Sequence, residues 1–140
     1  MAPADGDPPL IAYVDTNILI RHLTDDPPAQ AGRASALLRD SERLILTDLV
    51  AAEVVYVLES FYERPRPEVA GALRSLLAVP SIAVFDHDLL LRSLELYEKF
   101  RLDFAEAYLA AAAELSGVEQ AASFDRSLDR VASIRRIQGL

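Results

Sequence analysis

The sequence contains no cysteine, and this absence excludes several classes of protein at once. Neither a disulfide framework nor a thiolate zinc site can form, and catalysis by a cysteine nucleophile is impossible, so we expect a reducing compartment, the cytoplasm. Long apolar runs are also missing, because charges interrupt every hydrophobic stretch before it reaches the roughly 20 residues needed to cross a bilayer. We therefore expect a soluble protein without a membrane partner.

Basic residues are in the minority, with 14 lysines and arginines against 22 acidic residues and a formal net charge of −8. This balance argues against a domain that holds nucleic acid on a broad basic surface. It does not exclude a nuclease that works with metal, because carboxylates gathered around cations make the total charge negative and the bound metal neutralises part of it. The five glycines form neither a dinucleotide fingerprint nor a P-loop.

The length of 140 residues and the apolar fraction of 51% fit one domain with a core large enough to fold unaided. Residues 1–9 are small, acidic and proline-rich, which is the opposite of a signal peptide. We interpret them as a disordered lead-in. Residues 10–140 are expected to form a single domain.

Strands and helices are predicted to alternate along this domain. The expected strands are 10–14, 44–46, 82–85 and 120–124, with 134–137 as an added edge strand. The expected helices are 17–23, 28–40, 47–62, 68–78, 86–100 and 103–116. Thr47 or Asp48 is expected to cap the helix 47–62, Asp86 to cap the helix 86–100, and Gly117 to end the helix 103–116. This order predicts an α/β fold, a three-layer α/β/α sandwich around a central, mainly parallel sheet of four or five strands.

Two aspartates directly follow predicted strands. Asp15 comes directly after the predicted strand 10–14, and Asp125 comes directly after the predicted strand 120–124. The carboxyl ends of parallel strands form the rim at which ligands bind, so both positions favour function. The alternative is that each aspartate simply caps the helix that follows, which is a frequent role of aspartate.

Glu53 lies in a predicted helix among apolar neighbours. The residues three and four positions away are Leu49, Val50, Tyr56 and Val57. A carboxylate in a core-facing stripe needs a cation or strong donors beside it, because burying an unpaired charge is costly. The alternative is a glutamate at the edge of the stripe that reaches water or pairs with an arginine.

Asp103 and Glu106 begin the last long predicted helix. Their spacing matches a capping box, in which an aspartate cap and a glutamate three residues later satisfy the first helical turn. The same spacing places both carboxylates on one helix face, where the helix dipole favours anions. Glu106 is next to Leu109 and Ala110 on that face, which indicates an inward orientation.

Acidic side chains from separate elements would repel one another unless a cation joined them. Oxygen-only ligation suits Mg²⁺ or Mn²⁺, whereas zinc prefers histidine or cysteine. His22 and His87 are poor candidates for ligands, since one ends a helix near a loop and the other lies in the first turn of a surface helix. The carboxylates together therefore predict a divalent metal site.

At this point the sequence resembles the PIN-domain ribonucleases, and in particular the toxin component of VapBC-type toxin–antitoxin pairs. The resemblance covers nearly all of the chain after Pro9. It rests on four segments in order: Val14-Asp15-Thr16-Asn17-Ile18, Ala52-Glu53-Val54, Asp103-Phe104-Ala105-Glu106-Ala107-Tyr108-Leu109-Ala110-Ala111 and Ser123-Phe124-Asp125.

The resemblance implies a role for each matched polar residue. The catalytic, metal-binding quartet would be Asp15, Glu53, Glu106 and Asp125, and Asp103 would be an additional acidic ligand. Thr16, Asn17 and Ser123 would support the site. The departure is Glu106, where the family usually has aspartate, so the longer side chain could shift the ion.

The resemblance also implies an activity and partners. The activity is that of an endoribonuclease that uses Mg²⁺ or Mn²⁺ to hydrolyse phosphodiester bonds of RNA. The implied partners are a VapB-like antitoxin and a second copy in a homodimer. Arginines near the rim, such as Arg21, Arg33 or Arg126, are candidates for docking the substrate, although ordinary surface charge explains any one of them.

Three alternatives remain open from the sequence. An aspartate-based phosphatase would also place Asp15 after the first strand, but it needs a second aspartate where Asn17 stands and a lysine at a later strand end, and the only lysine is Lys99. A PIN-like domain without catalysis would be a binding module. A nuclease directed at DNA is the third.

Overall fold

The computed structural model describes residues 9–139, which divide into two compact units, one that ends at Phe85 and one that begins at Asp86. We call them the N-terminal unit and the C-terminal unit and describe each by itself. The predicted disordered lead-in, residues 1–9, lies outside the described residues except for Pro9.

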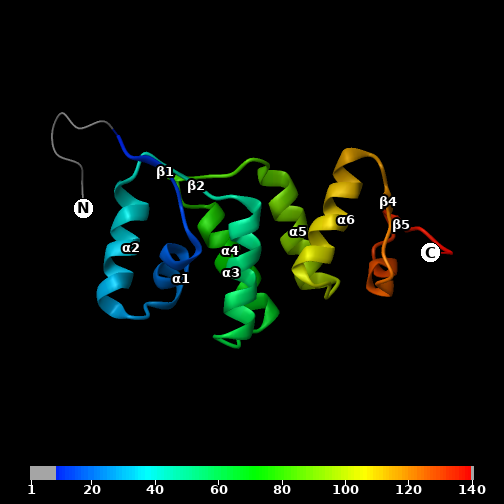
Figure 1. Cartoon of the computed structure of the whole chain (residues 1–140), viewed down its shortest axis with the longest axis horizontal. Helices are drawn as coiled ribbons and strands as arrows, with labels where there is room; N and C mark the ends of the chain where they lie inside the picture. The colour runs from blue at the N-terminus through cyan, green and yellow to red at the C-terminus, as the bar shows by residue number, and fades with distance from the viewer. Residues whose placement is uncertain (1–8, 140) are drawn as a thin grey trace. The chain divides into compact units, whose positions relative to one another are not determined.

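The N-terminal unit contains four helices and a parallel three-stranded sheet (Figure 1). In chain order the elements are β1 (Ile11–Tyr13), α1 (Thr16–Thr24), α2 (Pro28–Asp40), β2 (Arg43–Ile45), α3 (Asp48–Ser60), α4 (Arg66–Leu77) and β3 (Ile82–Ala83). The strand order is β1-β2-β3, and both neighbouring pairs are parallel. Parallel neighbours require crossover connections, which the helices between them provide.

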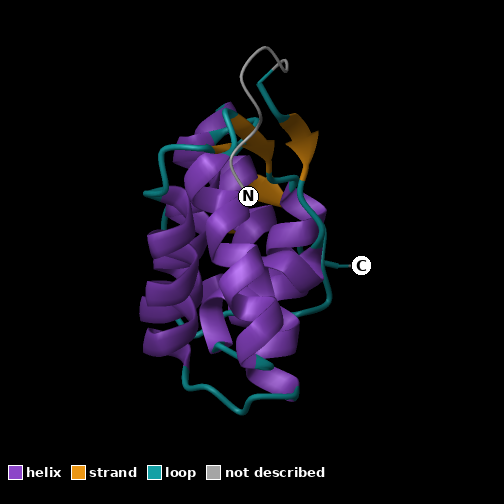
Figure 2. Cartoon of the chain, turned by 90° about the vertical axis from the view of Figure 1, so that its left-hand side faces the viewer, coloured by secondary structure: helices purple, strands orange, loops and turns teal. Residues whose placement is uncertain are grey.

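Local chemistry sets the helix ends of this unit much as the sequence predicts. The range of α2 is the predicted one, and the Thr47 hydroxyl accepts the Val50 amide at 3.2 Å to cap α3. Strands β1 and β3 are shorter than predicted, and β2 has the predicted three residues but begins one residue earlier. Figure 2 shows how small the strands are beside the helices. Side chains such as Leu19, Leu44 and Leu73 form a core that is almost fully buried.

The C-terminal unit contains two long helices, two short strands and a 3-10 turn. The elements are α5 (His87–Lys99), α6 (Phe104–Ser116), β4 (Gln120–Ala121), the 3-10 helix η1 (Arg126–Arg130) and β5 (Arg135–Arg136). Helices α5 and α6 pack against each other, and the rings of Tyr97 and Phe104 meet edge to face with centroids 6.3 Å apart. Two predicted caps are confirmed: Asp86 accepts the Leu89 amide at 3.0 Å, and Gly117 ends α6 with a left-handed φ of 79°.

The α/β class is confirmed, with six α-helices and small parallel sheets among residues 9–139. The prediction of one sheet with four or five strands is wrong for this structure, because β4 pairs with β5 in a separate two-stranded sheet, through Gln120 opposite Arg135 and Ala121 opposite Arg136. A strand does form near 134–137, as β5, but it pairs with β4 and is not an edge of the sheet of β1, β2 and β3. None of the helices in the described part of the chain has the length and apolar character that a membrane crossing requires.

Candidate active site

In the N-terminal unit, Thr16 links two of the predicted carboxylates. Asp15 follows β1 and caps α1, where its Oδ1 accepts the Thr16 amide at 2.8 Å. The buried Thr16 side chain donates its hydroxyl hydrogen to Oε2 of Glu53 at 2.6 Å, across 37 residues of sequence. A donor at this distance fixes the direction of a carboxylate. Thr16, the first residue of α1, therefore holds both carboxylates, Asp15 through its amide and Glu53 through its hydroxyl.

The expectation that Glu53 lies in a core-facing stripe is wrong. Glu53 is exposed, and two of its apolar neighbours are exposed as well, Leu49 at 72% and Tyr56 at 68%. The core face of α3 consists instead of Ala51, Val54, Val55 and Leu58. Asp15 and Asn17 are exposed too, so the polar groups around the start of α1 face solvent.

In the C-terminal unit, Glu106 is only partly exposed and one of its oxygens, Oε2, is buried without a hydrogen-bond partner among the described residues. Burial raises the pKa of the Glu106 carboxyl above its ordinary value, and the charges of Asp125 and Asp103 raise that pKa further. The predicted inward orientation holds for this oxygen, although Leu109, one of the two neighbours that indicated it, is 41% exposed. Three of the predicted carboxylates therefore interact electrostatically within this unit.

Asp125 is held as an anion. Its Oδ1 accepts the Ser127 amide at 2.9 Å, and its own amide donates to Oγ of Ser123 at 3.0 Å. Hydrogen bonds from Ser127 lower the pKa of Asp125 below its ordinary value, and the charges of Arg130 and Arg136 lower that pKa further. Ser123 thus fixes the backbone of Asp125, as a supporting residue should.

Asp103 does not act as a capping side chain. It occupies the position before α6, but its side chain makes no capping hydrogen bond, so the capping-box explanation of this pair is wrong. Asp15 and Asp125, by contrast, do cap the segments that follow them, so the structural explanation applies to both. A capping aspartate uses one oxygen for the helix and keeps the other available for a ligand.

Residues that sequence reasoning missed surround Asp125. Ser127 and Arg130 were not singled out, nor was Arg136, which donates to the Ser123 carbonyl oxygen at 3.2 Å and pairs with Asp129 at 3.1 Å. The pattern of Asp125 followed two residues later by a donor amide is that of an Asx turn, and it could have indicated Ser127. No local pattern marks Arg136, because its contacts depend on the pairing of β4 with β5.

The donor chemistry fits a hard divalent cation. The candidate groups are carboxylates and hydroxyls, and the buried oxygen of Glu106 is unpartnered beside two other negative charges. The histidines are used elsewhere or exposed, since Nδ1 of His22 lies 2.8 Å from Oγ of Ser35 and His87 is on the surface of α5. Within residues 9–139 no three acidic or histidine side chains already converge as a metal-binding group.

Comparison with known families supports the same conclusion as the carboxylates, a site for a divalent metal. Residues 12–134 match the PIN domain. This chain belongs to the PIN domain family. The PIN domain is generally a nuclease fold, which supports a hydrolase that acts on nucleic acid, and PIN domains typically bind divalent metals. No curated protein is similar enough to the chain to count as a match.

Proposed function

We propose that this PIN domain is a ribonuclease that depends on Mg²⁺ or Mn²⁺ and hydrolyses phosphodiester bonds of RNA. Residues 10–140 act as a single catalytic domain. Asp15, Glu53, Glu106 and Asp125 serve as catalytic carboxylates and hold the metal together with Asp103. Thr16, Asn17 and Ser123 support them.

The observation that carries this proposal is the environment of Glu106. A partly buried carboxylate with an unpartnered oxygen and two acidic neighbours is unfavourable by itself. A divalent cation would supply the missing partner and offset the repulsion. Together with the family match over residues 12–134, this supports a metal-dependent site in preference to a merely structural role of the acidic residues.

Other side chains orient the carboxylates and keep them charged for metal binding. A bound Mg²⁺ or Mn²⁺ would activate water for in-line attack on phosphorus and stabilise the charge that develops. Thr16 orients Glu53 through its 2.6 Å hydrogen bond, and Ser123 and Ser127 orient Asp125. The lowered pKa of Asp125 keeps this carboxylate charged and able to bind a cation. The carboxylates position the metal and do not attack phosphorus themselves.

The decisive experiment compares the parent chain with Asp15→Asn in cleavage of a single-stranded RNA oligonucleotide, with Mn²⁺ and with EDTA. The parent should cleave only with metal, and the variant should lose roughly 100-fold or more of the rate. Asparagine can still accept the Thr16 amide, so the variant should fold normally. Asp25→Asn is the matched control, because Asp25 is exposed at the end of α1 and its backbone, not its side chain, ends the helix.

Unchanged cleavage by Asp15→Asn would defeat the assignment of the site. Parallel assays with duplex RNA and with DNA decide the substrate class, and faster cleavage of DNA would change the assignment from a ribonuclease to a deoxyribonuclease.

The competing proposal is a binding module without catalysis, which Glu106 in place of the family's usual aspartate favours. Thermal unfolding with and without Mn²⁺ separates the two, because a functional site gains stability on binding metal.

The resemblance to VapC-type toxins extends the proposal to partners. We propose that the chain is the toxin of a toxin–antitoxin pair, with a VapB-like antitoxin and a homodimeric assembly. A short reading frame for a DNA-binding protein directly upstream is the expected genomic arrangement. Light scattering of the purified chain should give the mass of a dimer, and a monomer at all concentrations would contradict that part.

A further inference from the structure

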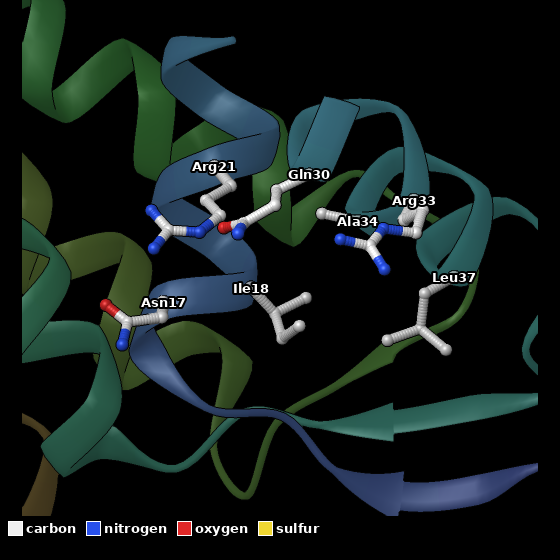
Figure 3. Close-up of a pocket in the computed structure, with 7 residues that line it drawn as sticks. All are labelled: Asn17, Ile18, Arg21, Gln30, Arg33, Ala34 and Leu37. Atoms are coloured by element: carbon white, nitrogen blue, oxygen red, sulfur yellow. The ribbon is translucent and has the colours of Figure 1, made fainter. Parts of the chain in front are cut away.

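The N-terminal unit has an open pocket of about 330 Å³ between α1 and α2 (Figure 3). Asn17, Ile18 and Arg21 line it from α1, and Gln30, Arg33, Ala34 and Leu37 line it from α2. The volume is at the lower end of the range for small-ligand sites. Residue spacings of three and four on each helix show that one face of α1 looks toward one face of α2 across this pocket.

The two helices that form the pocket are fixed to each other. Nδ1 of His22 lies 2.8 Å from Oγ of Ser35, which joins α1 to α2. The buried side chains of Ile20 on α1 and Ala31 on α2 belong to the core of the same unit. The pocket is therefore a built feature of two packed helices and does not depend on a loop.

The charge in this pocket is uncompensated. Within residues 9–139 neither Arg21 nor Arg33 forms an ion pair, and the guanidinium of Arg21 makes only a long hydrogen bond, 3.5 Å, to the carbonyl oxygen of Asp26. Arg43, Arg101 and Arg126 likewise form no ion pair among residues 9–139, so the lack of a counter-charge alone does not mark this pocket. What distinguishes Arg21 and Arg33 is that both line the same pocket, one from each helix. Two guanidinium groups at one pocket favour a ligand that carries negative charge.

The remaining groups of the pocket restrict the kind of anion. Ile18, Ala34 and Leu37 give an apolar surface, while Asn17 and Gln30 offer amide donors and acceptors. Figure 3 shows the side chains of Arg21 and Asn17 on α1, and those of Gln30 and Arg33 on α2, with the guanidinium of Arg33 directed over the pocket. A nucleotide of a single strand has matching parts: a phosphate for arginine, a flat base for apolar or guanidinium surfaces, and a base edge for amides.

We propose that this pocket is a subsite for one nucleotide of a single-stranded RNA that extends from the cleavage site. The proposal rests on the proposed ribonuclease function, because it uses the same substrate. Asn17 lines the pocket and lies two residues after Asp15, so the subsite begins within one helical turn of a proposed metal ligand. Arg21 and Arg33 hold phosphate, and the apolar surface takes the base.

The test measures binding of a fluorescent single-stranded RNA octamer to the full chain in EDTA, where metal-dependent cleavage cannot occur. Arg21→Gln and Arg33→Gln should each raise the Kd by about tenfold. The double variant should flatten the dependence of log Kd on log salt by about 1.4, the value for two lost phosphate contacts on a single strand. Gln30→Glu keeps the size of the side chain but places a carboxylate in the pocket that Arg21 and Arg33 line, and it should weaken binding as well.

Arg43→Gln is the matched control, since it makes the same charge change on an exposed residue of β2 outside the pocket. Its Kd should stay within about twofold of the parent. Thermal unfolding of every variant verifies that the fold is intact. A Kd and a salt slope of the double variant equal to those of Arg43→Gln would overturn the subsite.

The outcomes separate this inference from the proposed function. If the double variant binds normally while the parent cleaves RNA with Mn²⁺, the subsite is wrong and the nuclease assignment stands. If the octamer binds through the arginines but no metal-dependent cleavage occurs, the nuclease assignment fails and the binding pocket stands. If an acidic peptide binds at this pocket and the RNA octamer does not compete with it, the pocket docks a protein and the proposal is overturned.

Discussion

Replacing Glu106 by glutamine should stabilise the protein in the absence of metal. The change removes a charge whose Oε2 is buried without a partner among the described residues and whose pKa is raised by burial and by Asp125 and Asp103. Glutamine leaves a polar group at this position but removes the charge that burial and the two aspartates disfavour. Leaving a buried group unpaired costs about 1–3 kcal/mol and more when it is charged, and we take about 1 kcal/mol for the charge alone because Glu106 is partly exposed. A gain of about 1 kcal/mol corresponds to a melting temperature about 3–5 °C higher for a chain of this size.

Metal should reduce the stability difference between the two proteins or reverse it. At a free Mn²⁺ concentration ten times the Kd, the parent gains about 1.4 kcal/mol from binding. Glu106→Gln binds the ion more weakly and gains less, so the two unfolding curves should approach or cross as Mn²⁺ is added. Calorimetric or fluorescence-monitored unfolding in EDTA and in an Mn²⁺ series measures both effects.

Glu119→Gln is the control for this experiment, because it makes the same chemical change on an exposed side chain of the same unit. It should change the melting temperature by less than about 1 °C with and without metal. A Glu106→Gln variant that is less stable than the parent in EDTA would refute the reasoning, since it would mean that the carboxylate has a favourable partner.

Three further predictions concern hydrogen bonds and backbone geometry. Arg92 binds Glu114 through two nitrogens, at 2.8 and 3.0 Å, and lowers the pKa of Glu114, so Glu114→Gln should lose about 1–2 kcal/mol near neutral pH. The lowered pKa contributes stability above the ordinary pKa of about 4.3, and this stability disappears as the pH falls toward 3, so urea unfolding from pH 7 to pH 3 should show a smaller difference between the two proteins at low pH. Thr16→Val keeps the shape but removes the bond to Glu53, and should cost about 1 kcal/mol in urea unfolding and weaken Mn²⁺ binding in calorimetry. Gly117→Ala forces a side chain into a left-handed backbone and should lower stability by about 1 kcal/mol, measured by thermal unfolding.

Conservative variants check each of these explanations. Thr16→Ser keeps the hydroxyl and should bind Mn²⁺ like the parent; if it behaves like Thr16→Val, the methyl group matters and the hydrogen bond does not. Gly71→Ala in the helical interior of α4, where a new Cβ meets nothing within 4 Å, should stabilise by about 0.5–1 kcal/mol. Equal effects at Gly117 and Gly71 would contradict the backbone argument. A Glu114→Gln loss that is the same at pH 7 and pH 3 would contradict the assigned ion pair.

The sequence predicts the helices better than the strands, for physical reasons. Caps are local: Thr47 and Asp86 accept amides three residues later, and Gly117 ends α6 in a left-handed conformation that glycine adopts without strain because it has no Cβ. Strand pairing is not local. Of the predicted strand 120–124 only Gln120–Ala121 forms, so Asp125 does not directly follow a strand as predicted. The pairing of β4 with β5 in a separate sheet could not be read from the pattern.

Among the candidate site residues, the orientation of Glu106 is predictable and that of Glu53 is not. In α6 the small residues on one face leave a clear inner side, which includes Ala107 and Ala110. In α3 apolar residues occur all around the helix, so apolar neighbours at three and four positions do not identify the buried face. The hydroxyl of Thr16 that reaches Glu53 across 37 residues is a tertiary contact with no local signal.

The brevity of the strands determines what keeps the start of α1 in place. Each strand contributes two or three residues, so the ladder that leads to Asp15 ends at the Val14 amide, 3.0 Å from the carbonyl oxygen of Ile45. Beyond that bond, the segment is held by the cap of α1 and by the side chain of Thr16. The packing of the helices therefore keeps the start of α1 rigid. Substitutions that loosen α1 or α3 would make the positions of Asp15 and Glu53 less well defined without changing either residue.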